Sequence, residues 1–242
     1  MRRKENRFYI ACYNMDTEST QDGYLTAFMA NKFHSKLTVK LPNPKIQDKP
    51  TRKYIEARFH LMKLIDGLPD SVRMTQQEEV RTFFRYLNDV CSSAKELYRL
   101  LDSKLEKPEC FIIIHFANLT WDLDILRGII FDGTYKYNTV GDETDLIQFT
   151  YGGLCFRDFL RVTGFRSIKM AGMCCTNAHK GEGESVYSIT KEQIPKRYDD
   201  YTEEQRYYME NDVLVMDEAL NIILNRRENY AIRTLNDLPM TS

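Results

Sequence analysis

The stretch Glu109-Cys-Phe-Ile-Ile-Ile-His-Phe116, which continues as Ala-Asn118-Leu-Thr-Trp-Asp122, decides how the rest of the chain is interpreted. A near-continuous apolar run of this length is typical of a strand that is covered on both faces, as in α/β proteins. A helix is predicted directly after it, at about 120–130. Ligands of α/β proteins usually bind beyond the carboxyl ends of central strands, so Asn118 and Asp122 lie where a site is expected.

The remaining elements fit a mixed sheet flanked by helices. Further strands are expected at 8–14, 24–28, 37–41, 135–140, 146–151 and 154–157. Thr75-Gln-Gln-Glu78 and Thr202-Glu-Glu-Gln205 are capping boxes, which predict a long helix up to residue 101 and a last helix up to about residue 225. The order of these elements predicts one α/β domain, with an insertion at about 31–107.

The composition is that of a globular protein without a strong overall charge. Hydrophobic residues make up 43% of the 242 residues, which excludes a disordered chain. The net charge of −1 means that any DNA binding must rely on local basic patches. The absence of a membrane-spanning run and of a signal peptide predicts a cytoplasmic protein, in the host cell if the protein is viral, whose six cysteines are reduced.

A pair of acidic residues, Asp16 and Glu18, follows the first expected strand. Side chains two apart in a strand point to the same face, so both carboxylates can reach one site. Two-metal nucleases hold two divalent ions about 3.5–4 Å apart between converging carboxylates. Such hard oxygen ligands suit Mg²⁺ or Mn²⁺. A solvated strand end is the alternative interpretation, and it is the more frequent one for an isolated Asp-x-Glu.

Two further pairs lie four residues apart, the spacing at which side chains share a helix face. Asn118 and Asp122 follow the central strand, where a helix N-cap with an acid in the first turn is an equal alternative. Tyr208 and Asp212 lie early in the last helix, where a phenol can orient a metal-bound water and a carboxylate can bind the metal. The Tyr-x-x-x-Asp sequence at 98–102 falls between the first two motifs and is interpreted as structural.

Together, the three motifs resemble those of DEDDy 3′→5′ exonucleases, and they are most similar to the exonuclease domains of protein-primed family B DNA polymerases of phages and linear plasmids. There the second motif typically reads aromatic-His-Asn-Leu-x-Phe-Asp, and the third reads Tyr-x-x-Asn-Asp followed by aliphatic residues. This chain has Phe116-Ala-Asn-Leu-Thr-Trp-Asp122 and Tyr208-Met-Glu-Asn-Asp212-Val-Leu-Val. The resemblance covers roughly residues 7–30 and 108–225.

The resemblance implies a ribonuclease H-like mixed β-sheet flanked by helices and a site for two divalent ions, Mg²⁺ or Mn²⁺. Four carboxylates would bind these ions, those of Asp16, Glu18, Asp122 and Asp212. Tyr208 would position the attacking water. The implied reaction is hydrolysis of single-stranded DNA 3′ ends to nucleoside 5′-monophosphates, as in polymerase proofreading.

The resemblance also implies contacts to DNA. Ser19 follows the acidic pair as a DNA contact, and Asn118 and Trp121 would hold the 3′-terminal bases, Trp121 by stacking. Ser167, with the isoleucine after it, would match a Ser/Thr-Leu motif that contacts DNA. Lys180 is the first candidate for a lysine that the family uses for DNA binding and catalysis.

Three features differ from the family pattern or leave a choice open. Thr17 stands where an aromatic residue is usual, and Ala117 stands where a histidine is common, which weakens one expected DNA contact. Lys169 is the second candidate for the lysine.

The chain has no room for a polymerase domain, and residues 226–242 resemble the connector that leads towards one. The expected partners are a single-stranded DNA 3′ end, a polymerase domain or split polymerase subunit, and a terminal protein, with no membrane. Two alternatives remain open. One is a catalytically silent ribonuclease H-like module that binds nucleic acid or a protein partner. The other is an exonuclease of the same mechanism that acts on RNA, because DNA and RNA differ at the 2′-hydroxyl and not at the metals.

Overall fold

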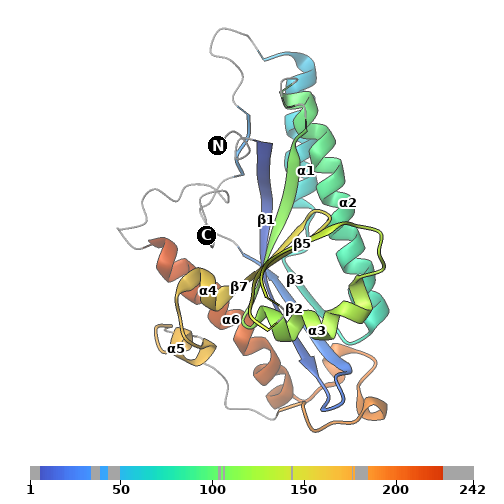
Figure 1. The fold of residues 1–242 in the computed structure, drawn as a ribbon, viewed down its shortest axis with the longest axis vertical. Helices are drawn as coiled ribbons and strands as arrows, with labels where there is room; N and C mark the ends of the chain where they lie inside the picture. Colours follow the sequence, from blue (N-terminus) through green and yellow to red (C-terminus); the bar gives the residue numbers. More distant parts are fainter. Residues whose placement is uncertain are drawn as a thin grey trace.

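A computed structural model describes residues 6–33, 39–42, 50–102, 105, 107–142, 144–175, 177 and 185–225 (Figure 1). Its helices and strands are β1 (Arg7–Ser19), β2 (Leu25–Lys32), α1 (Arg52–Asp66), β3 (Ser71–Met74), α2 (Gln77–Leu101), β4 (Glu109–Phe116), α3 (Leu119–Ile130), β5 (Tyr137–Gly141), β6 (Leu146–Tyr151), β7 (Leu154–Asp158), α4 (Phe159–Thr163), α5 (Ile168–Gly172) and α6 (Glu203–Asn225). Short 3₁₀ helices lie at Lys191–Gln193 and Tyr198–Asp200.

The strands form one seven-stranded sheet in the order β3-β2-β1-β4-β7-β6-β5. β4 pairs in parallel with β1 and with β7, whereas the β1–β2, β2–β3, β7–β6 and β6–β5 pairs are antiparallel. The predicted α/β mixed sheet is therefore confirmed. The apolar run at 109–116 is the interior strand β4, which lies between β1 and β7.

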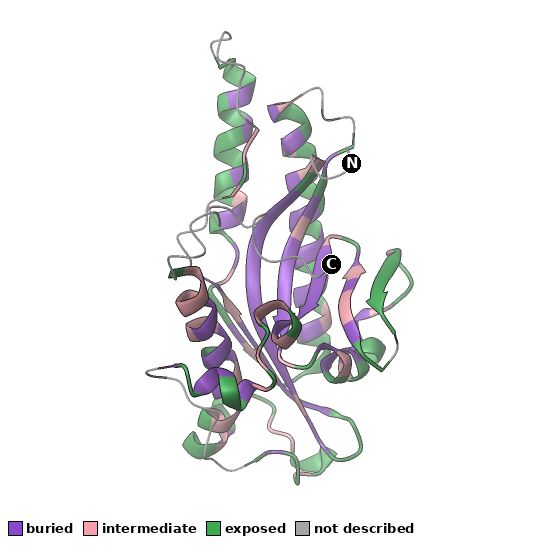
Figure 2. Cartoon of the chain, turned by 60° about the vertical axis from the view of Figure 1, so that its left-hand side comes forward, coloured by how far each residue is buried: buried purple, intermediate pink, exposed green. Residues whose placement is uncertain are grey.

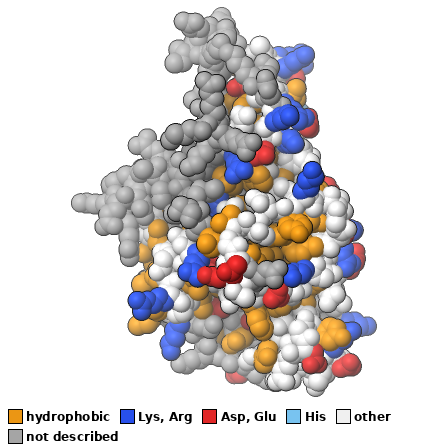
Figure 3. All heavy atoms as spheres, viewed as in Figure 1, with side chains coloured by type: hydrophobic (Ala, Val, Ile, Leu, Met, Phe, Trp, Pro, Cys, Tyr) orange, Lys and Arg blue, Asp and Glu red, His pale blue; other side chains and the backbone are white. Residues whose placement is uncertain are grey.

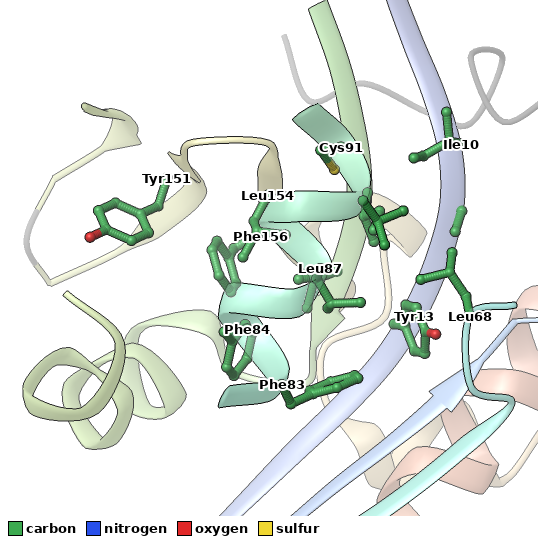
Figure 4. Close-up of a cluster of buried hydrophobic side chains, with 14 of the residues drawn as sticks. Ile10, Tyr13, Leu68, Phe83, Phe84, Leu87, Cys91, Tyr151, Leu154 and Phe156 are labelled. Atoms are coloured by element: carbon green, nitrogen blue, oxygen red, sulfur yellow. The ribbon is translucent and has the colours of Figure 1, made fainter. Parts of the chain in front are cut away.

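Each face of the sheet has its own hydrophobic core. α1, α2 and α3 cover one face, and α4, α5 and α6 cover the other. β4 contributes Ile112 and Ile114 to the first core and Ile113 to the second, which explains why consecutive residues of this strand are apolar. Figure 4 shows part of the first core, where Phe84 and Leu87 of α2 lie against the strands. The central strands are buried, whereas β5 is exposed along its whole length at the end of the sheet (Figure 2).

The two predicted capping boxes have different outcomes. At α6, Thr202 N donates to Gln205 Oε1 at 3.1 Å and Gln205 N donates to Thr202 Oγ1 at 3.2 Å, so this capping box is confirmed. At α2, the helix begins at Gln77, and its N-cap residue, Gln76, makes no capping hydrogen bond through its side chain. The Thr75 hydroxyl instead donates to Lys196 O at 2.9 Å, so the predicted box is wrong while the helix itself is confirmed.

The region between β2 and β4 differs most from the sequence-based expectation. The strand expected at 37–41 is wrong for residues 39–41, which form no strand, and residues 34–38 lie outside the described residues. Neither α1 nor β3 was predicted. β3 pairs with β2, and α2 packs against the sheet, so much of the segment 31–107 belongs to the sheet and its first core.

All six cysteines are free, as expected, and five of them are buried.

Among the helices of the described residues, none combines the length and the apolar character that crossing a membrane requires.

Replacing Gly152 with alanine is expected to lower the free energy of unfolding by about 2–5 kcal/mol. The φ of +61° at Gly152 is a left-handed conformation, and an added Cβ would collide with Asn88 Oδ1, which accepts a hydrogen bond from Gly153 N at 2.8 Å. Gly133 is a matched control because its φ is +78° but nothing lies within 4 Å of its added Cβ. Gly133→Ala should cost only about 1–2 kcal/mol in urea unfolding, and equal costs for the two variants would contradict the predicted collision.

Candidate functional site

The first acidic pair lies near the end of β1, on the face of the sheet that α6 covers. Asp16 pairs with Met29 and Glu18 with Ala27 of β2, and both of these β2 residues belong to the second core. Asn14, two residues before Asp16, has its side chain on the same face of β1 and donates a hydrogen bond to Asp217 of α6. The face that carries the acidic pair is therefore turned towards α6. Asp16 is buried, and Glu18 is half-buried.

Asp122 lies in the first turn of α3 and is only 2% exposed. Its Oδ1 atom accepts hydrogen bonds from the backbone N of Thr17 at 3.1 Å and from the Thr17 hydroxyl at 2.7 Å. Burial raises the pKa of Asp122 well above its usual value, the Thr17 hydrogen bonds oppose this, and the carboxylates of Glu18 and Asp212 raise it further. Asp122 is thus close to an acid of β1 and to an acid of α6.

The third motif lies early in α6. Asp212 is half-buried, and Tyr208, one turn earlier, packs against the second core. Tyr201, just before α6, donates from its hydroxyl to Thr26 O at 2.9 Å. Burial and then the Glu18 carboxylate raise the pKa of Tyr201 to about 12, so Glu18 also lies near the segment that leads into α6.

The structure therefore brings acids of all three motifs into one region. Glu18, Asp122 and Asp212 come from β1, α3 and α6, and Asp16 lies beside Glu18 on the same face of β1. Within the described residues, which include all four acids, no group of three or more His, Cys, Asp or Glu side chains is arranged to hold a metal ion. The donor chemistry suits a hard divalent cation because every candidate ligand is a carboxylate, and the charges of Glu18 and Asp212 disfavour ionisation of Asp122.

The residues expected to hold the terminal bases lie at the start of α3. Asn118 occupies the N-cap position, is exposed, and makes no capping hydrogen bond through its side chain. That role belongs to Asp158, whose Oδ2 accepts from Leu119 N at 3.2 Å and whose Oδ1 accepts from Arg161 N of α4 at 2.8 Å. Trp121 is 52% exposed, so its ring is available for stacking. The structural alternative is therefore confirmed for the positions, with Asn118 as the N-cap residue and Asp122 in the first turn, but not for a capping bond from the Asn118 side chain.

The remaining candidates for DNA contacts differ in how exposed they are. Ser19 is buried, and Ser167 caps α5 by accepting from Met170 N at 3.2 Å. Lys169 is exposed on α5, whereas Lys180 lies outside the described residues, as do residues 226–242.

A cleft of about 610 Å³ lies beside Asn118. Arg161, Phe165 and Arg166 line it, together with Asp145 and Asp158, and Arg161 forms an ion pair with Asp145 at 2.5 Å. Neither arginine was predicted as a site residue from the sequence. The available signal was a pair of basic residues on either side of Gly164-Phe165.

A second cleft, of about 950 Å³, lies between α3 and the β5–β6 hairpin. Its lining includes Phe131, Tyr137 and Phe149, and none of the predicted site residues. Figure 3 shows hydrophobic side chains exposed over this hairpin. The cleft is therefore separate from the region where the acids meet.

No protein-family model and no curated protein matches this sequence. The chain is similar to solved structures of phi29 DNA polymerase. The complex of that polymerase with single-stranded DNA matches with a TM-score of 0.50 and 15% identity, and the ternary complex with primer-template DNA and incoming nucleotide substrates matches with 0.50 and 14%. In both cases the match covers 89% of this chain and 32% of the polymerase chain, so this chain spans about a third of the polymerase's length.

At this level of identity, the similarity establishes the fold. The mixed sheet with helices on both faces confirms the predicted α/β fold, and the match is consistent with its ribonuclease H-like form.

Proposed function

We propose that this chain is a metal-dependent 3′→5′ exonuclease domain for single-stranded DNA ends, of the kind that serves a protein-primed family B DNA polymerase. One observation supports this most strongly: the pKa of Asp122 is raised first by burial and further by the nearby carboxylates of Glu18 and Asp212. These acids belong to the three exonuclease motifs and come from three separate parts of the chain. The structural similarity to a polymerase bound to single-stranded DNA supports DNA as the substrate class.

In this proposal, Asp16, Glu18, Asp122 and Asp212 hold two ions, Mg²⁺ or Mn²⁺. When bound, the ions would supply activation of the attacking water and stabilisation of the departing 3′ oxygen. Thr17 orients Asp122 by donating both hydrogen bonds to Oδ1, and among the described residues Oδ2 receives no hydrogen bond. The threonine in place of the family's usual aromatic residue therefore has its own positioning role.

The other residues of the proposal bind and orient the substrate. The Tyr208 phenol lies one helical turn before Asp212 and would hold the attacking water by a hydrogen bond. Asn118 and Trp121 would hold the terminal bases. Arg161 and Arg166 would contact phosphates from the cleft beside Asn118. Ser19, Ser167 and the lysine, whether Lys180 or Lys169, complete the proposed DNA contacts.

The proposal is tested with oligonucleotides labelled at the 5′ end. Single-stranded DNA should be shortened stepwise from its 3′ end, with nucleoside 5′-monophosphates as products, in Mg²⁺ or Mn²⁺ but not in excess EDTA. Absence of shortening with either metal would contradict the proposal. Faster shortening of an RNA oligonucleotide of the same sequence would favour the RNA-directed alternative.

The catalytically silent module remains a second candidate because the four described acids are not arranged to hold a metal. Tight binding of single-stranded DNA, without hydrolysis in Mg²⁺ or Mn²⁺, would be the result expected for that module. The same oligonucleotides in a fluorescence-anisotropy titration separate the two functions.

Replacing Trp121 with alanine should raise KM for a single-stranded 3′ end by about 5- to 150-fold, since stacking contributes about 1–3 kcal/mol per base. The thermal midpoint should change little because Trp121 is 52% exposed. Tyr137→Ala is the matched control, since this ring is 71% exposed but lines the other cleft. Initial rates over a range of DNA concentrations give KM, and an unchanged KM in Trp121→Ala would refute the stacking role.

A further inference from the structure

A polar cluster that no motif predicted lies on the same face of the sheet as the acids. Asp217 of α6 accepts hydrogen bonds from Asn14 Nδ2 of β1 at 2.6 Å and from Asn31 Nδ2 of β2 at 2.9 Å. Asn14 and Asn31 are directly paired in the β1–β2 ladder. Each oxygen of the Asp217 carboxylate therefore receives a hydrogen bond from one of two adjacent strands.

The cluster continues to β4 through His115. Asn14 Oδ1 lies 3.1 Å from His115 Nδ1. Because Asn14 uses its Nδ2 as a donor to Asp217, its Oδ1 is the acceptor, and the proton on His115 is assigned to Nδ1. Both side chains are fully buried. Burial, followed by the Arg157 charge, lowers the pKa of His115 to about 3, so the ring is neutral at physiological pH.

Three of the four members of this cluster lie close in sequence to residues of the proposed site. Asn14 is two residues before Asp16 on β1. His115 lies near the end of β4, three residues before Asn118. Asp217 follows Asp212 by five residues on α6. The hydrogen bonds thus join β1 and α6, which carry acids, to β4, which leads into α3 with Asp122.

The apolar contacts of α6 cannot set this alignment alone. Val213, Met216 and Leu220 pack against the second core, and such packing is non-directional. Hydrogen bonds to a carboxylate are directional and stronger than neutral ones. A misplacement of about 1 Å can reduce an enzymatic rate by about 100-fold. A directional contact between α6 and β1 would hold Asp212 of α6 in a fixed position relative to the acids of β1.

We propose that Asp217, with Asn14, Asn31 and His115, positions α6 against β1 and β4 and so sets the geometry of the proposed metal site. The inference rests on the proposed exonuclease function. Asp217 belongs to none of the three motifs, and its carboxylate accepts hydrogen bonds from two asparagines of the sheet. It therefore acts as a positioning residue.

The test uses Asp217→Asn in the full chain. The variant keeps the shape of the side chain, but its amide can accept from only one of the two asparagines. We expect kcat to fall at least 10-fold with KM for DNA changed less than twofold, and the Kd of Mn²⁺ measured by titration calorimetry to rise at least fivefold. Asp89→Asn is the control for the lost charge, because Asp89 is exposed on α2. This variant should have the wild-type kcat, KM for DNA and Kd of Mn²⁺.

All rates are measured well below the lowest thermal midpoint, so that partial unfolding does not contribute. A wild-type kcat and a wild-type Mn²⁺ affinity in Asp217→Asn would overturn the positioning role, even if its thermal midpoint falls. If this variant does not fold, Asn31→Ala, which removes one of the two hydrogen bonds at a half-buried position, replaces it with the same criteria. An inactive wild type would instead refute the proposed exonuclease function. Failure of the positioning role and failure of the proposed function thus give different results.

Discussion

Replacing Asp122 with asparagine is expected to make the metal-free protein more stable while removing its nuclease activity. Asp122 is buried, and its pKa is raised by burial and by the charges of Glu18 and Asp212. Asparagine keeps the shape and an Oδ1 atom that can accept from Thr17. Relief of the buried charge is worth about 1–3 kcal/mol, which for a chain of this size is a rise of about 2–12 °C in thermal midpoint.

The same substitution should lower kcat by about 1,000-fold or more, since a bound metal contributes several kcal/mol to the transition state. Asp124→Asn is the matched control on α3, because Asp124 is exposed and forms only an ion pair with Arg127 at 3.7 Å. It should leave both the midpoint and the rate unchanged. A drop in midpoint for Asp122→Asn, or retained hydrolysis, would contradict the role given to this carboxylate.

Addition of Mg²⁺ should raise the thermal midpoint of the wild type by about 5–11 °C at a concentration about 100-fold above its Kd, where binding adds about 2.7 kcal/mol. A cation relieves the repulsion among carboxylates from β1, α3 and α6, which the unfolded chain does not have. Asp16→Ala should remove most of this rise, and Asp89→Ala, an exposed acid of α2, should keep it. Melting curves with Mg²⁺ and with EDTA give the shifts, and equal shifts in wild type and Asp16→Ala would count against the metal site.

The elements that sequence predicted well are those whose signals are local. The apolar run of β4 encodes burial on two faces, and the hydrogen-bonded capping box at Thr202 encodes the start of α6. The spacing of the acids on β1, α3 and α6 was also informative, because two-residue and four-residue steps fix which side chains share a face. These signals predicted the region in which the acids meet.

Two features that the sequence did not predict, the strand β3 and the role of Thr75, depend on partners far away in the chain. β3 has only four residues and exists as a strand because β2 offers it an edge. Thr75 could have capped α2, but its hydroxyl bonds to Lys196, more than a hundred residues away. α1 did carry a usable signal, since Tyr54, Ala57, Leu61 and Ile65 follow helical spacing and Thr51 caps the helix.

The polar cluster at Asp217 shows the same limit more strongly. Asn14 and Asp217 are separated by 203 residues, and neither belongs to a local pattern. Such a contact appears only once β1, β2 and α6 are placed together in space.

Asp158 links the two sides of the sheet in a way that constrains motion. Its two oxygens accept from the first turns of helices on opposite faces, from Leu119 N of α3 and from Arg161 N of α4. If α4 moves outward from β7, either one of these bonds breaks or the turn at Asn118 is pulled along with it. The carboxylate at the end of β7 therefore couples the position of α4 to that of the Asn118–Trp121 turn.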